Sequence, residues 1–174
     1  RIKLAIIGAG RMGITHYSII NSHPDVTIES VADPSKVILS MMGKYLPIKT
    51  YKDYQELFAE SAPDAVMVCT PPNLHYDIIE KAAAKNVHVF AEKPFTTSFS
   101  QASALARLYE DRKLVNQVGY VNRFNDIFCK VKGLLEEGII GRVIRFKSEM
   151  FSCTVTGSDE GSGWRATRES GGGA

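Results

Sequence analysis

The hexapeptide GAGRMG at residues 8–13 restricts the possible fold more than any other part of the sequence. It directly follows the apolar run at residues 2–8 and precedes a helical pattern over residues 11–22. Between a buried strand and a helix, three glycines at this spacing permit a tight turn, a close approach of a pyrophosphate, and close helix–strand packing. We therefore expect Gly8, Gly10 and Gly13 to form a dinucleotide-binding turn at the positive end of a helix.

Short apolar runs alternate with helical patterns as far as residue 120. This alternation predicts βαβ units and one parallel sheet, and right-handed crossovers make the sheet doubly wound. The predicted fold class is therefore α/β with a Rossmann sheet, and the predicted dinucleotide-binding domain spans residues 1–120. Strands are expected at residues 2–8, 26–33, 48–51, 64–70, 87–91 and 114–120, and helices at 11–22, 35–46, from 53, 74–85 and 98–111.

Residues 121–174 follow a different pattern. A helix over residues 125–137 ends at Gly138, and residues 141–151 alternate like a half-exposed antiparallel strand. We interpret this part as the beginning of a second α/β domain, incomplete in this chain. Capping boxes are expected at Asp53 and at Ser98, each with Glu or Gln three residues later.

Composition excludes several classes of function. The 174 residues are 44% hydrophobic and 23% charged, with a formal net charge of +2, so neither a nucleic-acid nor a membrane-surface partner is indicated. The three cysteines form no CxxC, which favours a reducing compartment and argues against a metal site. We see no leader peptide and no apolar run of the ~20 residues that span a bilayer, so we expect a cytoplasmic protein.

Asp33 ends the second expected strand, 20 residues after Gly13. An acid at this spacing accepts hydrogen bonds from the adenosine ribose and repels a 2′-phosphate, which favours NAD over NADP. Lys36 is close enough in sequence to soften that preference, although it also fits a solvated helix position. NAD is the expected cofactor, with NADP possible.

The other strand ends matter because ligands of open α/β sheets bind beyond the carboxyl ends of the strands. After the fourth strand, Thr70, Pro71 and Pro72 predict a stiff turn that suits a flat cofactor. Asn73 fits either a cofactor contact or the N-cap of the next helix. His75 fits either a ligand contact or a surface position on that helix.

The fifth strand ends in Glu92, Lys93 and Pro94. A lysine on the cofactor edge can donate to a substrate hydroxyl or carbonyl oxygen and stabilise the charge that develops during hydride transfer. We expect Glu92 to orient Lys93 or hold it charged. The alternative is a solvated lysine at a strand end.

Together the segments IKLAIIGAGRMG, VAD, VCTPPNLH, FAEKP and GYVNRF resemble the Gfo/Idh/MocA family of NAD(P)-dependent oxidoreductases. The resemblance covers almost the whole chain, and the E-K-P after the fifth strand is its most specific element. It implies a Rossmann domain followed by an α/β domain on an open antiparallel sheet, whose face commonly forms the substrate pocket and often a homo-oligomer interface.

The resemblance also implies roles for individual residues. Lys93 would be the catalytic lysine and Pro94 would follow a cis peptide. Substrate contacts would come from Lys93 and from Tyr120, Asn122, Arg123, Trp164 and Arg165. Tyr120, Asn122 and Arg123 also fit a surface cluster at a helix start. Trp164 and Arg165 also fit a loop. Cofactor contacts would come from Gly8, Gly10, Arg11, Met12, Gly13, Asp33, Thr70, Pro71, Asn73, His75, Glu92 and Lys93.

The sequence departs from the family pattern at its end. In the family a G-G-G run leads to D-x-G-x-H, whose Asp and His complete the site, whereas here ESGGGA ends at Ala174. We therefore expect an oxidoreductase that acts, as a whole protein, on a secondary alcohol of a sugar, cyclitol or sugar derivative, with this chain an inactive fragment. The alternative is a non-catalytic regulator that senses the dinucleotide, against which the intact E-K-P argues.

Overall fold

The computed structural model describes residues 1–149. Six parallel strands form one sheet in the order β3-β2-β1-β4-β5-β6, so β1 lies at the point where the strand order reverses. This is the doubly wound Rossmann order, and it confirms the predicted fold class. The strands are β1 (Ile2–Ile7), β2 (Val26–Ala32), β3 (Lys49–Tyr51), β4 (Ala65–Val68), β5 (His88–Ala91) and β6 (Asn116–Val118).

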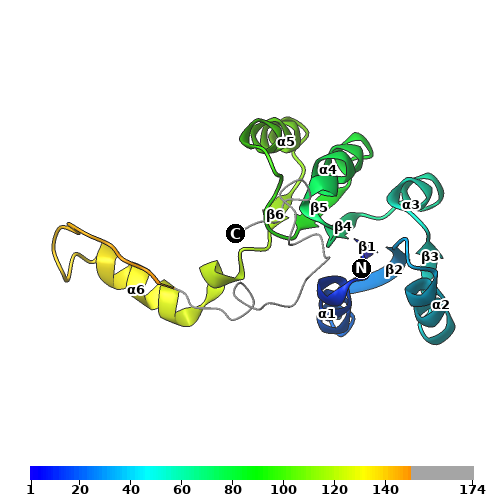
Figure 1. Ribbon diagram of the computed structural model, residues 1–174, viewed down its shortest axis with the longest axis horizontal. Helices are drawn as coiled ribbons and strands as arrows, with labels where there is room; N and C mark the ends of the chain where they lie inside the picture. The colour runs from blue at the N-terminus through cyan, green and yellow to red at the C-terminus, as the bar shows by residue number, and fades with distance from the viewer. Residues whose placement is uncertain (150–174) are drawn as a thin grey trace, which may run out of the picture.

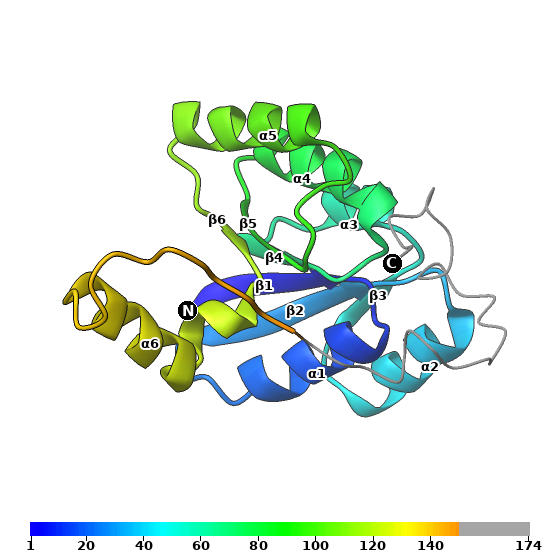
Figure 2. The ribbon, with the colours of Figure 1, turned by 60° about the vertical axis from the view of Figure 1, so that its left-hand side comes forward.

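Helices cover both faces of the sheet (Figures 1 and 2). Two of them, α1 and α2, lie on one face, and three, α3, α4 and α5, lie on the other. The chain therefore changes face between β3 and β4, as the reversed strand order requires. Their bounds are α1 (Arg11–Ile20), α2 (Lys36–Tyr45), α3 (Tyr54–Glu60), α4 (His75–Ala84) and α5 (Phe99–Asp111).

Each face of the sheet has its own apolar core, and β1 contributes to both. Ala5 and Ile7 belong to the core under α3, α4 and α5, whereas Leu4 and Ile6 belong to the core that includes Tyr17 of α1. Alternate residues of a strand point to opposite faces, so a strand buried on both sides needs an uninterrupted apolar run. This explains why the sequence of β1 shows no polar alternation.

The carboxyl ends of the strands stop at the same level. The first residue after each of five strands donates its backbone N–H to the last residue of a neighbouring strand, at 2.8 to 3.1 Å. The turns that follow these strands are therefore held along one edge of the sheet. The five bonds run from Gly8 to Ala32, Asp33 to Tyr51, Cys69 to Ile7, Glu92 to Val68 and Gly119 to Ala91.

Of the two predicted capping boxes, only the one at Asp53 has its N-cap bond. The Asp53 carboxylate accepts a hydrogen bond from the Glu56 N–H at 2.8 Å, as expected of an N-cap. Ser98 also occupies an N-cap position, but its hydroxyl makes no capping bond and lies 2.8 Å from the Ser100 hydroxyl. The predicted capping box at Ser98 is therefore wrong, because a neighbouring side chain takes the hydroxyl.

Residues 121–149, after β6, pack on little of the rest of the described chain (Figure 1). A short 3₁₀ turn, η2 (Val121–Phe124), leads into α6 (Asp126–Glu136), which has no buried residue. Gly138 has a φ of +72° after the end of α6, as predicted for the end of this helix. The predicted domain boundary at residue 120 stays a prediction.

The strand predicted over residues 141–151 is not found where the structure describes the chain. Residues 141–149 are exposed and irregular, and no strand of residues 1–149 pairs with them. An isolated strand leaves its backbone groups without partners, so the alternating pattern alone cannot form one. Residues 150 and 151 lie outside the described part.

Within residues 1–149 no helix is both long and apolar enough to span a bilayer.

Candidate cofactor and catalytic site

The glycine turn connects β1 to α1 and packs tightly against the turn after β4. Gly8 has a φ of +96°, and a Cβ there would lie 2.8 Å from the Cys69 carbonyl carbon. A Cβ at Gly13 would collide with the Gly8 carbonyl oxygen. At Gly10, by contrast, a Cβ would meet nothing within 4 Å. Gly8 and Gly13 are therefore required by the protein itself, and only Gly10 borders open space.

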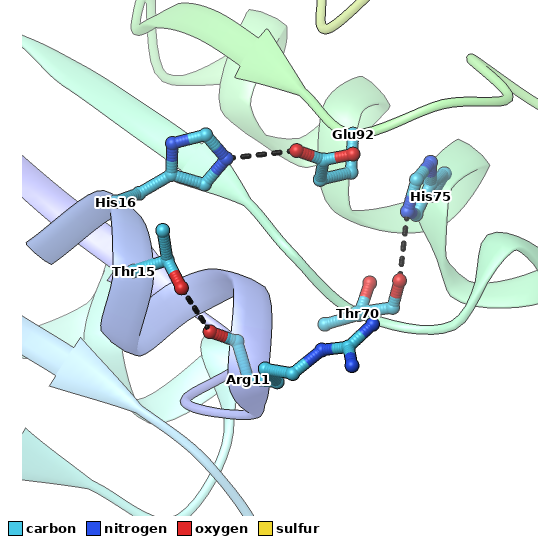
Figure 3. A network of polar contacts seen from close by, with 6 residues as sticks. All are labelled: Arg11, Thr15, His16, Thr70, His75 and Glu92. Atoms are coloured by element: carbon cyan, nitrogen blue, oxygen red, sulfur yellow. Dashed lines mark hydrogen bonds and ion pairs between the residues drawn. The ribbon is translucent and has the colours of Figure 1, made fainter.

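The N-terminus of α1 is free to bind an anion. No side chain caps this terminus, and no acidic residue lies in the first turn of the helix. An uncapped helix N-terminus offers unpaired N–H groups and a partial positive charge. Arg11 is exposed, and its side chain extends from the start of α1 toward Thr70 (Figure 3). Met12, the next residue, is partly buried.

Asp33 links the glycine turn to the start of α2. Its Oδ2 accepts a 2.7 Å hydrogen bond from the Ala9 N–H, and its Oδ1 accepts one of 2.8 Å from the Ser35 N–H. The side chain is partly exposed, so each oxygen keeps further accepting capacity. Sequence spacing predicted the place of this carboxylate but not its bond to the glycine turn.

The turn after β4 contains a hydroxyl that lacks a partner. Thr70 Oγ1 is buried and makes no hydrogen bond within residues 1–149. Pro71 leads into the 3₁₀ turn η1 (Pro72–Leu74), which precedes α4. Asn73 is exposed within η1, and Leu74 occupies the N-cap of α4, so the N-cap interpretation of Asn73 is wrong. Its cofactor contact stays a prediction.

His75 lies inside the protein. Its side chain is fully buried, with Nδ1 2.9 Å from the Pro94 carbonyl oxygen and Nε2 3.0 Å from the Thr70 carbonyl oxygen (Figure 3). The surface interpretation of His75 is therefore wrong. Both neighbours only accept, so the neutral tautomer decides which of the two carbonyl oxygens receives the ring N–H. His75 ties the turn after β4 to the segment after β5, and its direct contact with a cofactor stays a prediction.

Glu92 is paired with a residue that the sequence reasoning did not single out. Its Oε1 lies 2.8 Å from Nε2 of His16 on α1 (Figure 3). Lys93 is exposed and makes no ion pair within the described chain, and the Lys93–Pro94 peptide is cis, as the family resemblance implied. Glu92 therefore contacts the helix of the glycine turn. A histidine three residues after the last glycine was the only signal for this pair in the sequence.

Cys69 lies between these groups, at the end of β4. Burial raises the pKa of its thiol to about 12, and the nearby Glu92 carboxylate adds to the shift. A thiol in this environment stays protonated and is a poor nucleophile at neutral pH. We therefore assign Cys69 no chemical role. No group of three or more potential metal-binding side chains occurs in residues 1–149.

The predicted substrate residues are exposed around η2 or lie outside the described chain. Tyr120, Asn122 and Arg123 are exposed in and beside η2. Trp164 and Arg165 lie outside residues 1–149. Substrate contacts by these five residues stay predictions.

The strand order and the geometry of the glycine turn are those of a dinucleotide-binding Rossmann sheet. The family model described as "Oxidoreductase family, NAD-binding Rossmann fold" matches residues 2–120. The chain therefore belongs to the Gfo/Idh/MocA oxidoreductase family, and its sheet is the NAD-binding Rossmann fold of that family.

Several curated relatives are inositol dehydrogenases. The NAD(+)-dependent scyllo-inositol 2-dehydrogenase of Bacillus subtilis (strain 168) is 30% identical over 149 residues, which make up 84% of this chain and 44% of that protein. The myo-inositol 2-dehydrogenase of Thermotoga maritima is 29% identical over 150 residues, with 84% and 45% covered. The chain thus spans less than half the length of these relatives.

A solved structure shows the same fold. Scyllo-inositol dehydrogenase from Lactobacillus casei, with NAD(H) and scyllo-inositol bound, superposes with a TM-score of 0.74 at 26% identity. The match covers 80% of this chain and 42% of that one.

Proposed function

We propose that the whole protein to which this chain belongs is an NAD-dependent dehydrogenase that oxidises a secondary alcohol of a cyclitol or sugar. The placement of Lys93 carries the proposal. Lys93 is exposed two residues after the end of β5, on the edge of the sheet that also carries the glycine turn and Asp33. Open α/β sheets bind cofactor and substrate at this edge.

The residues present fit NAD. The open space at Gly10 and the uncapped start of α1 suit the pyrophosphate. Asp33 suits the ribose hydroxyls, because its oxygens can accept hydrogen bonds in addition to those from Ala9 and Ser35. The unpartnered Thr70 hydroxyl offers a polar contact in the turn after β4.

Bound NAD supplies an acceptor for the hydride that leaves the alcohol carbon. The Lys93 ammonium donates a hydrogen bond to the alcohol oxygen and stabilises the negative charge that develops there. In the reverse direction the same ammonium polarises a ketone. Because Glu92 is engaged by His16, we propose that Lys93 acts without a carboxylate partner from this part of the chain.

The relatives support the class of substrate. The Bacillus subtilis and Thermotoga maritima proteins are inositol 2-dehydrogenases by name, and the Lactobacillus casei structure contains scyllo-inositol. The family resemblance implies that the histidine of a D-x-G-x-H motif transfers the proton of the alcohol. The 174 residues of the sequence do not include that motif, so we infer that they bind NAD but do not turn over substrate by themselves.

Lys93→Ala in the full-length protein tests the proposal. We expect kcat with inositols or related sugars to fall by about two to four orders of magnitude while NADH affinity changes little. Lys85→Ala is the matched control, since Lys85 is an exposed lysine that follows α4 at the opposite edge of the sheet. Full activity of Lys93→Ala would refute the assignment, and NADH binding without turnover of a broad polyol panel would favour a regulatory protein.

A further inference from the structure

Among the side-chain hydrogen bonds of residues 1–149, only the one between His16 and Glu92 connects α1 to the E-K-P segment. Nε2 and Oε1 are 2.8 Å apart, and the two side chains are only 15% and 14% exposed. An ionised carboxylate has no proton to donate, so Nε2 is the donor of this hydrogen bond. The contact is short and shielded from water, which makes it stronger than a surface pair.

Packing on both sides holds the pair in place. The His16 ring meets the Phe90 ring edge-on, with centroids 5.3 Å apart at an interplanar angle of 70°. Gly119, after β6, is buried, and a Cβ there would lie 3.0 Å from the Phe90 ring and 3.4 Å from Glu92 Oε1. The carboxylate therefore sits in a space bounded by α1, β5 and the end of β6.

This arrangement leaves Lys93 without its neighbouring carboxylate. A lysine side chain is long and flexible enough to turn back toward the carboxylate of the residue before it. A shielded carboxylate without a partner is costly, so without His16 the Glu92 carboxylate would recruit the nearest ammonium. The nearest one in sequence belongs to Lys93.

We propose that His16 is a positioning residue for the dehydrogenase reaction. By donating to Glu92 from α1, it holds the carboxylate away from Lys93 and keeps the Lys93 ammonium available for the substrate oxygen. The inference rests on the proposed function, because it assumes that Lys93 acts on the substrate.

The experiment compares variants of the full-length enzyme at saturating NAD. We expect His16→Ala to lower kcat by about tenfold or more, with substrate KM and NADH affinity within about threefold of wild type. Gln carries an N–H at a reach similar to that of Nε2, so we expect His16→Gln to recover most of the activity. His23→Ala is the matched control, since His23 is exposed beyond α1 and contacts only the Asp25 N–H through its ring.

A double variant separates positioning from general packing. If His16 acts only through Glu92, kcat of His16→Ala/Glu92→Ala equals that of Glu92→Ala alone. Additive losses, unchanged kcat in His16→Ala, or His16→Gln no better than His16→Ala would overturn the proposal. If His16→Ala does not fold, the activity of the His16→Gln enzyme decides: near wild type supports the proposal and a tenfold loss overturns it.

The parallel Lys93→Ala measurement keeps the two proposals apart. Full activity of that variant would remove the proposed function. An inactive Lys93→Ala enzyme beside a fully active His16→Ala enzyme would remove only the role of His16.

Discussion

The Asp33 carboxylate accepts a 2.7 Å hydrogen bond from the backbone N–H of Ala9, between the first two glycines of the turn. Asp33, which we propose favours NAD over NADP, therefore also supports the glycine turn, which we propose binds the pyrophosphate of the cofactor. A second bond, from Ser35 N–H to the other oxygen, extends the same support to α2. Changes at Asp33 should consequently affect both selectivity and loop geometry.

Asp33→Asn should separate these two effects. The amide keeps one accepting oxygen but loses the charge and the second acceptor. We expect NADH affinity to fall about tenfold and the preference for NADH over NADPH to shrink, because the charge that repels a 2′-phosphate is gone. Fluorescence titration with both cofactors measures this, with Asp111→Asn on α5 as the control. An equal loss of affinity for both cofactors would mean that Asp33 only supports the loop.

Two alanine substitutions in the glycine turn should affect different properties: Gly8→Ala should lower stability, and Gly10→Ala should lower NADH affinity. Gly8→Ala places a Cβ against the Cys69 backbone at a positive φ, so we expect a loss of about 1–3 kcal/mol in unfolding free energy. Gly10→Ala meets open space, so stability should change by less than about 1 kcal/mol. NADH affinity should nevertheless fall in Gly10→Ala. Urea unfolding and NADH titration test both, and unaltered NADH binding by Gly10→Ala would contradict the assignment of this space to the pyrophosphate.

The Cys69 thiol should make the folded state less stable at high pH. Its pKa is raised to about 12 in the folded protein, whereas an unfolded cysteine ionises near ~8.5. The thiol therefore loses its proton in the unfolded state first. The contribution of the buried thiol to the free energy of unfolding is complete below pH ~8.5 and declines as the pH rises toward 12. The free energy of unfolding of the wild type, relative to that of Cys69→Ala, should fall by up to about 2 kcal/mol between pH 8.5 and 10. Urea unfolding at both pH values measures this, with Cys129→Ala as control, and a constant difference would contradict it.

Residues of α5 and α6 should differ sharply in their contribution to stability. Leu105 on α5 is 1% exposed and belongs to the core under α3, α4 and α5. Leu105→Ala should therefore cost about 2–5 kcal/mol of unfolding free energy. Phe128 on α6 is 55% exposed, so in the 174-residue chain Phe128→Ala should cost less than about 1 kcal/mol. Thermal and urea unfolding test the pair. Similar losses would show that α6 packs on the rest of this chain.

The sequence predicted the sheet well because each strand's burial is encoded locally. The apolar run of β1 and the glycines after it specify a doubly covered strand and a tight turn within a dozen residues. The same reasoning failed at Ser98, where a competing hydroxyl takes the cap. It also failed at residues 141–149, where strand formation depends on partners that a local pattern cannot supply.

The site was predictable only in part because its contacts join distant segments. The order of strands placed Asp33 and Lys93 on one edge from topology alone. Which side chains pair at that edge depends on contacts between segments that are distant in the sequence. His16 and Glu92, for example, are 76 positions apart. For the same reason the burial of His75 against two backbone carbonyls was not visible in the sequence.

The central position of β1 has a consequence for how the chain folds. β1 pairs on one side with β2 and on the other with β4, where Leu4 lies opposite Ala65. Neither pairing is a local hairpin, because parallel strands need a long crossover connection. Sheets of this kind depend on contacts between residues distant in the sequence, and such topologies fold slowly. Removing the first seven residues would leave β2–β3 and β4–β5–β6 with no common strand. β1 is therefore the one strand of residues 1–149 that joins the two halves of the sheet.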